Sequence, residues 1–199
     1  VTDLNDPYKM DRLLQGDVGS GKTAVAAATL YATIKAGYQT AIMAPTEILA
    51  NQHFETFFEF FKDLNISVAL LTSSTPKKER NTILSLLEVG EIELLIGTHS
   101  LIQEDVKFNN LKYVITDEQH RFGVRQRQLL SNKGEAVNSL MMTATPIPRS
   151  LAITLITDIK VSTIDELPAG RKKVQTYKAN NKSFYKVLDN IRMELDNGR

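Results

Sequence analysis

Residues 16–23, with the letters GDVGSGKT, constrain this chain more than any other stretch. A glycine, four free positions and then Gly-Lys-Thr form the pattern of a loop that wraps phosphate groups, because glycines let successive backbone N–H groups turn toward one anion. Such a loop needs a strand before it and a helix after it. Residues 12–15 suit a short strand, and the alanine-rich residues 24–35 suit a helix that stops at Gly37. The sequence therefore predicts a nucleotide-binding loop.

The residue types in the loop assign its roles. Lys22 is expected to reach the β- and γ-phosphates of a nucleoside triphosphate, and the Thr23 hydroxyl to be a ligand of Mg²⁺. The start of the following helix favours the same anion. Glycine-rich turns before helices also occur without a ligand, but eight matching positions in the right context favour binding. The expected nucleotide-binding residues are Gly16, Asp17, Val18, Gly19, Ser20, Gly21, Lys22 and Thr23.

Length and composition indicate one globular domain, or one domain and part of another, in 199 residues. The hydrophobic content of 42% and the charged content of 24% are ordinary for a soluble protein. No apolar run reaches the length of a membrane span, and residues 1–10 are too polar for a signal peptide. With no cysteine, the chain forms no disulfide framework, which suits a cytoplasmic protein.

The charge is unevenly distributed along the chain. Residues 1–120 hold 10 Lys and Arg against 16 Asp and Glu, whereas residues 121–199 hold 14 against 7. A basic second half could face phosphates, and it could equally be a solvated surface.

Short apolar runs alternate with longer helical patterns after the loop. The runs at residues 40–44, 68–71, 93–96, 113–116 and 139–143 predict buried strands. Helices are expected at residues 46–63, 76–88 and 148–157, the second with Thr75 as cap and Pro76 as first helical residue. The expected fold is α/β, a mostly parallel sheet with helices on both faces and ligands at the carboxyl ends of the strands. Four phenylalanines of the first of these helices are expected in the core, namely Phe54, Phe57, Phe58 and Phe61.

The pattern weakens beyond Lys160. Residues 167–171 suggest a turn or linker, residues 173–177 a strand and residues 181–195 a helix. We therefore expect one domain over residues 1–165 and the start of another over residues 166–199.

An acidic pair, Asp117 and Glu118, follows the expected strand at residues 113–116. This is the arrangement of a Walker B motif, in which Asp117 would hold Mg²⁺ and Glu118 would polarise the water that attacks the γ-phosphate. Such a pair alone is weak evidence, because many are solvated turn residues. Together with the loop it predicts a Mg²⁺-dependent nucleoside triphosphatase site.

Four further motifs resemble those of a known family. Residues 117–124 have the letters DEQHRFGV, residues 143–149 have TATPIPR, residues 45–52 have the spacing PTxxLxxQ, and residues 97–99 have GTH. Residues 3–198 resemble the first RecA-like motor domain, a P-loop NTPase domain, of a superfamily-two helicase, most closely of the RecG family of bacterial ATP-dependent DNA helicases. The transcription-repair coupling factor shares several of these motifs but typically has DEEH, so Gln119 of this DEQH box favours RecG.

The resemblance implies ATP and Mg²⁺ as cofactors and adds roles for other residues. Gln119 and His120 would sense the nucleotide, and Thr143 and Thr145 would couple hydrolysis to movement. Thr46 could instead simply cap a helix, and His99 and His120 could be structural. Each of Arg121, Arg125, Arg127 and Arg149 could contact phosphate or face solvent. The residues that would contact the DNA backbone are Pro45, Thr46, Gln52, Gly97, Thr98 and His99.

By resemblance, the function is ATP-driven remodelling of branched DNA, such as stalled forks and Holliday junctions, in recombination and repair. The second RecA-like domain, its arginine finger and the wedge domain would lie outside these residues, so residues 1–199 alone are expected to bind Mg²⁺ and ATP weakly, to hydrolyse ATP very slowly and to unwind nothing. The alternatives are a coupling-factor-like translocase, a nucleotide-dependent switch module and a small-molecule kinase. Glu118 and the TAT run argue against the last two.

Overall fold

A computed structural model of the chain describes residues 2–6, 8–118, 121–145, 159–165, 178, 183–196 and 198. The chain divides into two compact units, Val1–Leu167 and Pro168–Arg199. The first unit holds every described strand and all described helices but one, and the second holds helix α6 (Phe184–Asp196). That the second unit begins a further RecA-like domain stays a prediction.

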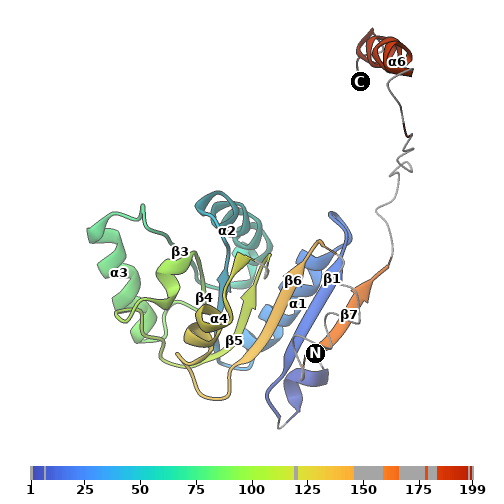
Figure 1. The fold of residues 1–199 in the computed structure, drawn as a ribbon. Coiled ribbons are helices and arrows are strands. Elements are labelled where there is room, and N and C mark those ends of the chain that lie inside the picture. The colour runs from blue at the N-terminus through green and yellow to red at the C-terminus, as the bar shows by residue number, and fades with distance from the viewer. Residues whose placement is uncertain are drawn as a thin grey trace. The chain divides into compact units, whose positions relative to one another are not determined.

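The first unit is built on a seven-stranded sheet with the order β3-β4-β2-β5-β6-β1-β7 (Figure 1). Every pairing between neighbouring strands is parallel, which confirms the expected parallel sheet. Four of the five central strands, β4, β2, β5 and β6, are largely buried, as strands covered on both faces must be. The strands are β1 (Asp11–Gly16), β2 (Gln39–Met43), β3 (Val68–Leu71), β4 (Leu94–Gly97), β5 (Leu111–Thr116), β6 (Asn138–Thr143) and β7 (Lys160–Ile164).

Helices cover both faces of the sheet. On one face, α1 (Lys22–Lys35) and α2 (Glu47–Phe61) pack on a core that includes Ile42. On the other, α3 (Lys77–Glu88), the 3₁₀ turn η3 (His99–Ile102) and α4 (Val124–Ser131) pack on a second core that includes Ala41 and Met43. Successive residues of β2 thus point to opposite layers. Two short 3₁₀ turns, η1 (Thr2–Asn5) and η2 (Lys62–Leu64), complete the described elements of this unit.

Two details of the helices correct the expectations from sequence. Pro76 is the N-cap of α3 and Lys77 its first residue, whereas Thr75 does not cap the helix. The Thr75 hydroxyl instead accepts a hydrogen bond of 3.0 Å from the backbone N–H of Thr72, which closes the turn before the helix. In α2, Phe58 is 48% exposed rather than part of the core, because it lies about 100° around the helix from the buried Phe57.

The later part of the chain was predicted least well. Strand β7 was not expected, and it pairs with the free side of β1. Helix α6 agrees with the helix expected at residues 181–195. The helix expected at residues 148–157, the turn at 167–171 and the strand at 173–177 lie outside the described residues.

Candidate functional site

The glycine-rich loop connects the carboxyl end of β1 to the start of α1. Gly19 and Gly21 have φ angles of 79° and 97°, in the left-handed region that favours glycine. At Gly16 the constraint is space, since a Cβ would lie 2.5 Å from the Ser20 hydroxyl. The backbone conformation therefore favours glycine at positions 19 and 21, and at position 16 a side chain would displace the Ser20 hydroxyl and press on Cβ of Ile164 at 3.2 Å.

Lys22 and Ser20 supply polar side-chain groups at the loop. The Lys22 ammonium donates hydrogen bonds of 2.7 Å and 2.8 Å to the carbonyl oxygens of Gly16 and Asp17, so it lies over the loop rather than in solvent. The Ser20 hydroxyl is buried and has no hydrogen-bond partner among the described residues. A buried hydroxyl without a partner is costly, and a phosphate oxygen at the loop would satisfy it. Thr23 follows in the first turn of α1, as expected for a ligand of nucleotide-bound Mg²⁺.

Asp117 and Glu118 follow β5 directly. The two oxygens of the Asp117 carboxylate accept hydrogen bonds, Oδ1 from the Glu118 backbone N–H at 2.9 Å and Oδ2 from His53 Nε2 at 2.8 Å. Glu118 has a φ of 48°, an unusual value for a residue other than glycine and one that costs on the order of 1 kcal/mol. Backbone strain of this kind is concentrated at functional sites.

The Mg²⁺ ion that the motif implies would need ligands from a nucleotide as well as from protein side chains at this site. In the part of the chain that the structure describes, no three His, Cys, Asp or Glu side chains are grouped so as to hold a metal ion. Mg²⁺ commonly binds through one or two protein oxygens, waters and substrate phosphates. The Asp117 carboxylate and the Thr23 hydroxyl are suitable oxygen donors of this type.

Strand β6 lies between the two parts of the expected nucleotide site. β5 and β1 are both its neighbours, so their carboxyl ends are about 10 Å apart. Thr143 is opposite Gln15 of β1 and is fully buried. Its hydroxyl is 2.9 Å from the hydroxyl of the exposed Thr145 and accepts a bond from the Thr145 backbone N–H. The two threonines therefore form one small turn beside the glycine-rich loop.

The two segments expected to contact DNA follow β2 and β4, which are neighbours. The backbone N–H of Ala44 donates to the carbonyl of Gly97 at 2.8 Å, so residues 45–46 and 97–99 lie together. Thr46 is exposed and caps α2, accepting a bond from the Leu49 N–H at 3.3 Å, which is the alternative role that the sequence left open. Pro45 is half-buried beside it, and Gln52 is exposed on the second turn of α2.

In the second of these segments, packing explains two of the three residues. A Cβ at Gly97 would lie 2.1 Å from the carbonyl oxygen of Leu71, so this glycine is required by the β3–β4 pairing. Thr98 is buried, whereas His99 is exposed, with its ring centroid 5.4 Å from that of Phe122. Only His99 of this segment offers its side chain freely to a ligand at the surface.

Sequence reasoning missed two residues of this region, His53 and Glu47. His53 directly follows Gln52 in α2, which was its only indication in the sequence. Glu47 accepts hydrogen bonds from the hydroxyls of Ser73 and Ser74 and from the Ser74 backbone N–H. The bond from Ser73, followed by those from Ser74, holds the pKa of the Glu47 carboxyl below its usual value. Glu47 thus joins the start of α2 to the loop after β3.

The remaining expected residues are exposed, half-buried or outside the described residues. Arg121 and Arg125 are exposed, while burial lowers the pKa of the half-buried Arg127. Gln119, His120 and Arg149 lie outside the described residues. None of the helices in the described ranges is long and apolar enough to cross a membrane.

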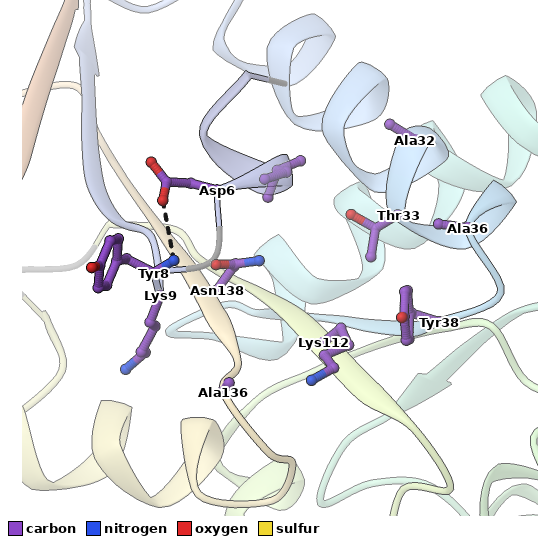
Figure 2. Close-up of a pocket in the computed structure, with 11 residues that line it drawn as sticks. Asp6, Tyr8, Lys9, Ala32, Thr33, Ala36, Tyr38, Lys112, Ala136 and Asn138 are labelled. Carbon is purple, nitrogen blue, oxygen red and sulfur yellow. Dashed lines mark hydrogen bonds between the residues drawn. The ribbon is translucent and has the colours of Figure 1, made fainter.

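A cavity of about 350 Å³ lies at the opposite edge of the sheet (Figure 2). Tyr38 directly precedes β2, Lys112 is the second residue of β5 and Asn138 begins β6, so the cavity is at the amino ends of these strands. Lys112 Nζ lies 6.0 Å from the centroid of the Tyr38 ring. None of the residues singled out in the sequence analysis lines it. The described residues that were expected to bind ATP or DNA lie instead at the carboxyl edge, where parallel sheets bind ligands.

The glycine-rich loop, the acidic pair and the parallel sheet between two helical layers define a RecA-like P-loop NTPase domain. Proteins of known family and structure agree with this fold and these motifs. The chain belongs to the DEAD/DEAH box helicase family, whose family model matches residues 5–153.

Bacterial helicases are similar to this chain over its whole length. The ATP-dependent DNA helicase RecG of Bacillus subtilis (strain 168) is 56% identical over 199 residues, and that of Staphylococcus aureus (strain NCTC 8325 / PS 47) is 56% identical over 197. These matches cover 100% and 99% of this chain and 29% of each relative. The chain thus spans less than a third of the length of these relatives.

Solved structures agree with the fold. A structure of RecG bound to a three-way DNA junction matches 99% of this chain and 26% of that one, with a TM-score of 0.83 and 48% identity. The helicase MrfA, solved with DNA and AMPPNP, matches 79% of this chain and 25% of its own, with a TM-score of 0.62 and 17% identity. The second likeness concerns the fold alone.

Proposed function

We propose that this chain is the ATP-binding motor domain of a RecG-type DNA helicase, which couples ATP hydrolysis to remodelling of branched DNA. The observation that carries the proposal is the order of motifs along the carboxyl edge of the sheet. Residues 97–99 and 45–46 lie at the carboxyl ends of β4 and β2, and residues 117–118, 143–145 and 16–17 lie at those of β5, β6 and β1. The segments expected to contact DNA are therefore contiguous with those expected to bind ATP.

In this proposal each nucleotide residue acts through charge and position. The Lys22 ammonium leaves the carbonyls of Gly16 and Asp17 for the β- and γ-phosphates, and the loop N–H groups hold the β-phosphate. The Thr23 hydroxyl and the Asp117 carboxylate would hold Mg²⁺, which would supply neutralisation of the phosphate charge. Glu118 accepts a hydrogen bond from the attacking water and so orients and polarises it. Thr143 and Thr145 lie between these groups and would transmit the change to the rest of the edge.

The other half of the edge would meet the DNA backbone without reading its sequence. The exposed side chains of Thr46, Gln52 and His99 and the N-terminal amides of α2 are suited to phosphodiester oxygens. Since the chain covers 29% of its curated relatives, we propose that a second RecA-like domain, with an arginine finger, and a wedge domain are partners. We also propose a cytoplasmic location, because these relatives are bacterial DNA helicases.

The test is ATP hydrolysis by the complete natural protein with and without a three-way DNA junction. We expect the junction to stimulate hydrolysis more than linear duplex does, and Lys22→Ala to lower the stimulated rate at least about 100-fold without loss of the fold. Lys35→Ala, which removes an exposed lysine at the far end of the same helix, is the matched control. A protein that hydrolyses ATP but does not respond to any DNA would overturn the motor proposal in favour of a nucleotide switch.

A further inference from the structure

His53 lies near the middle of α2 and points toward the end of β5. Its Nε2 is 2.8 Å from Oδ2 of Asp117, and the two side chains are only 13% and 15% exposed. The centroid of the His53 ring is 6.1 Å from that of Phe57, which is fully buried in the core. The imidazole is therefore held by the packing of α2 as well as by the carboxylate.

This contact controls how the Asp117 carboxylate can turn. An ionised carboxylate only accepts hydrogen bonds, so Nε2 of His53 must carry the hydrogen and donate it. With Oδ1 held by the Glu118 N–H and Oδ2 by His53, rotation about the bond to the carboxyl group is blocked from both sides. Each oxygen retains a further lone pair, which can accept from a water of the Mg²⁺ shell.

The same helix leads to the expected DNA contacts. Thr46 caps α2 seven residues before His53, a distance of about 10 Å along the helix axis. The exposed Gln52 is the residue before His53. A helix transmits a displacement of its first turn along its length, so a phosphodiester held at Thr46 and Gln52 would change the position of the imidazole relative to Asp117.

We propose that His53 is a positioning residue for Asp117, and that its hydrogen bond links the metal-binding carboxylate to the DNA-facing end of α2. This inference rests on the proposed function, because it takes Asp117 as a metal-binding residue and the start of α2 as a DNA contact. Residues that fix a metal-binding carboxylate typically change metal affinity 10- to 100-fold when they are removed.

The first experiment measures the binding of Mn²⁺ to the complete natural protein, with a non-hydrolysable ATP analogue, by electron paramagnetic resonance. We expect His53→Phe, which keeps a ring and loses the donor, to weaken Mn²⁺ binding about 10-fold. His53→Gln, whose amide N–H can take the place of Nε2–H, should stay within about 2-fold of the parent protein. Glu55→Gln, an exposed change on the same helix, should have no effect.

Thermal unfolding of each variant shows whether the fold is retained. Equal weakening by His53→Phe and His53→Gln would assign the effect to packing of the ring and overturn the positioning role, as would unchanged affinity in His53→Phe. Lys22→Ala separates this inference from the proposed function. If Lys22→Ala binds the analogue normally, the nucleotide site itself is wrongly assigned, whereas if it fails to bind and His53→Phe is normal, only the role of His53 is wrong.

The second experiment repeats the Mn²⁺ titration with a three-way DNA junction present. We expect the junction to change Mn²⁺ affinity in the parent protein, and this change to be lost in His53→Phe and kept in His53→Gln. A DNA-dependent change that persists unaltered in His53→Phe would show that the link to α2 does not pass through this hydrogen bond.

Discussion

The backbone N–H of Asp117 donates a hydrogen bond of 3.0 Å to the carbonyl oxygen of Met43. Met43 is the last residue of β2 and Asp117 the first residue after β5, so this bond extends the β2–β5 pairing one residue beyond the strands. On one side of it the chain continues to Pro45 and Thr46, and on the other to Glu118. The two halves of the carboxyl edge are thus joined by the main chain as well as by His53.

Replacing Glu118 with Gln should separate nucleotide binding from hydrolysis. The glutamine amide has the same size as the carboxyl group, and the hydrogen bond from the backbone N–H of residue 118 to Asp117 is kept. The negative charge that would polarise the water is lost. We expect the rate of ATP hydrolysis to fall about 100-fold or more, with the affinity for a fluorescent ATP analogue unchanged. Phosphate release measures the rate of hydrolysis, and a fluorescence titration measures the affinity for the analogue. Glu104→Gln, which changes an exposed acidic residue outside the expected site, is the control. If Glu118→Gln hydrolysed ATP at the wild-type rate, a residue other than Glu118 would have to polarise the attacking water.

Gly97→Ala should destabilise the sheet. The new Cβ would lie 2.1 Å from the Leu71 carbonyl oxygen and 2.9 Å from Cδ2 of Leu101, so β3 and β4 would have to separate. We expect the free energy of unfolding to fall by about 3 kcal/mol in urea denaturation.

Gly123→Ala is the matched control for that change. Gly123 has a φ of −65°, and the nearest atom to a Cβ there is 3.9 Å away. Its free energy of unfolding should remain within about 0.5 kcal/mol of the parent value. If both alanine variants were equally stable, the contact between Gly97 and Leu71 would not be as close as described.

The buried side chain of Gln39 should be a main source of stability at the amino edge. Its Nε2 donates to the carbonyls of Leu87 and Ile92 at 2.9 Å and 2.7 Å, and its Oε1 accepts from the Asn110 N–H at 2.9 Å. Gln39→Ala leaves the buried carbonyls of Leu87 and Ile92 and the part-buried N–H of Asn110 without this partner, and we expect a loss of about 3 kcal/mol in the free energy of unfolding. Gln128→Ala, at an exposed position of α4, should change it little. A small loss in Gln39→Ala would mean that water replaces the amide.

Tyr113→Phe should change how stability depends on alkaline pH. The Tyr113 hydroxyl donates to the Thr29 hydroxyl at 3.0 Å, and burial raises its pKa above the ordinary value. In the unfolded chain this tyrosine loses its proton near pH 10, as model tyrosines do at about that pH, while the folded protein keeps it. The contribution of Tyr113 is therefore complete below about pH 10 and lost above it, by up to about 1.4 kcal/mol per pH unit.

The comparison between the two proteins isolates this group, since the other tyrosines are common to both. At pH 7 we expect Tyr113→Phe to be less stable than the parent protein by about 1 kcal/mol, because one buried hydrogen bond is lost. In urea denaturation near pH 11 the difference should shrink or reverse. A constant difference from pH 7 to pH 11 would indicate that Tyr113 ionises equally in both states.

Most of the strands that the sequence predicted are buried on both faces, although the edge strand β3 was also predicted with its observed bounds. Residues such as 113–116 form short continuous apolar runs, and a run of this kind is typical of a strand that is covered on both faces. Strand β7 escaped prediction because it is an edge strand with the letters KVSTI, whose side chains are largely exposed, and its partner β1 is about 150 residues away.

For the site, local motifs predicted which strand ends matter, but contacts between distant segments could not be deduced from them. The bond between His53 and Asp117 joins residues 64 apart in sequence. The role of Gly97 also depends on the neighbouring strand, since its motif suggested a ligand contact and the structure places Leu71 against it. Thr75 illustrates a smaller limit, because the sequence indicated it as the cap of α3 whereas its hydroxyl accepts a hydrogen bond within the preceding turn.

The position of β1 in the sheet has a consequence for the order in which the domain can form. Both neighbours of β1 are far downstream, with Asp11 opposite Ser139 and Arg12 opposite Lys160, whereas β2, β3, β4 and β5 can pair among themselves once residue 116 has been made. At about 5–20 residues per second on a ribosome, β1 would wait roughly 6 to 25 seconds for β6. The glycine-rich loop, which comes first in the sequence, would thus be among the last parts of the domain to take its final shape.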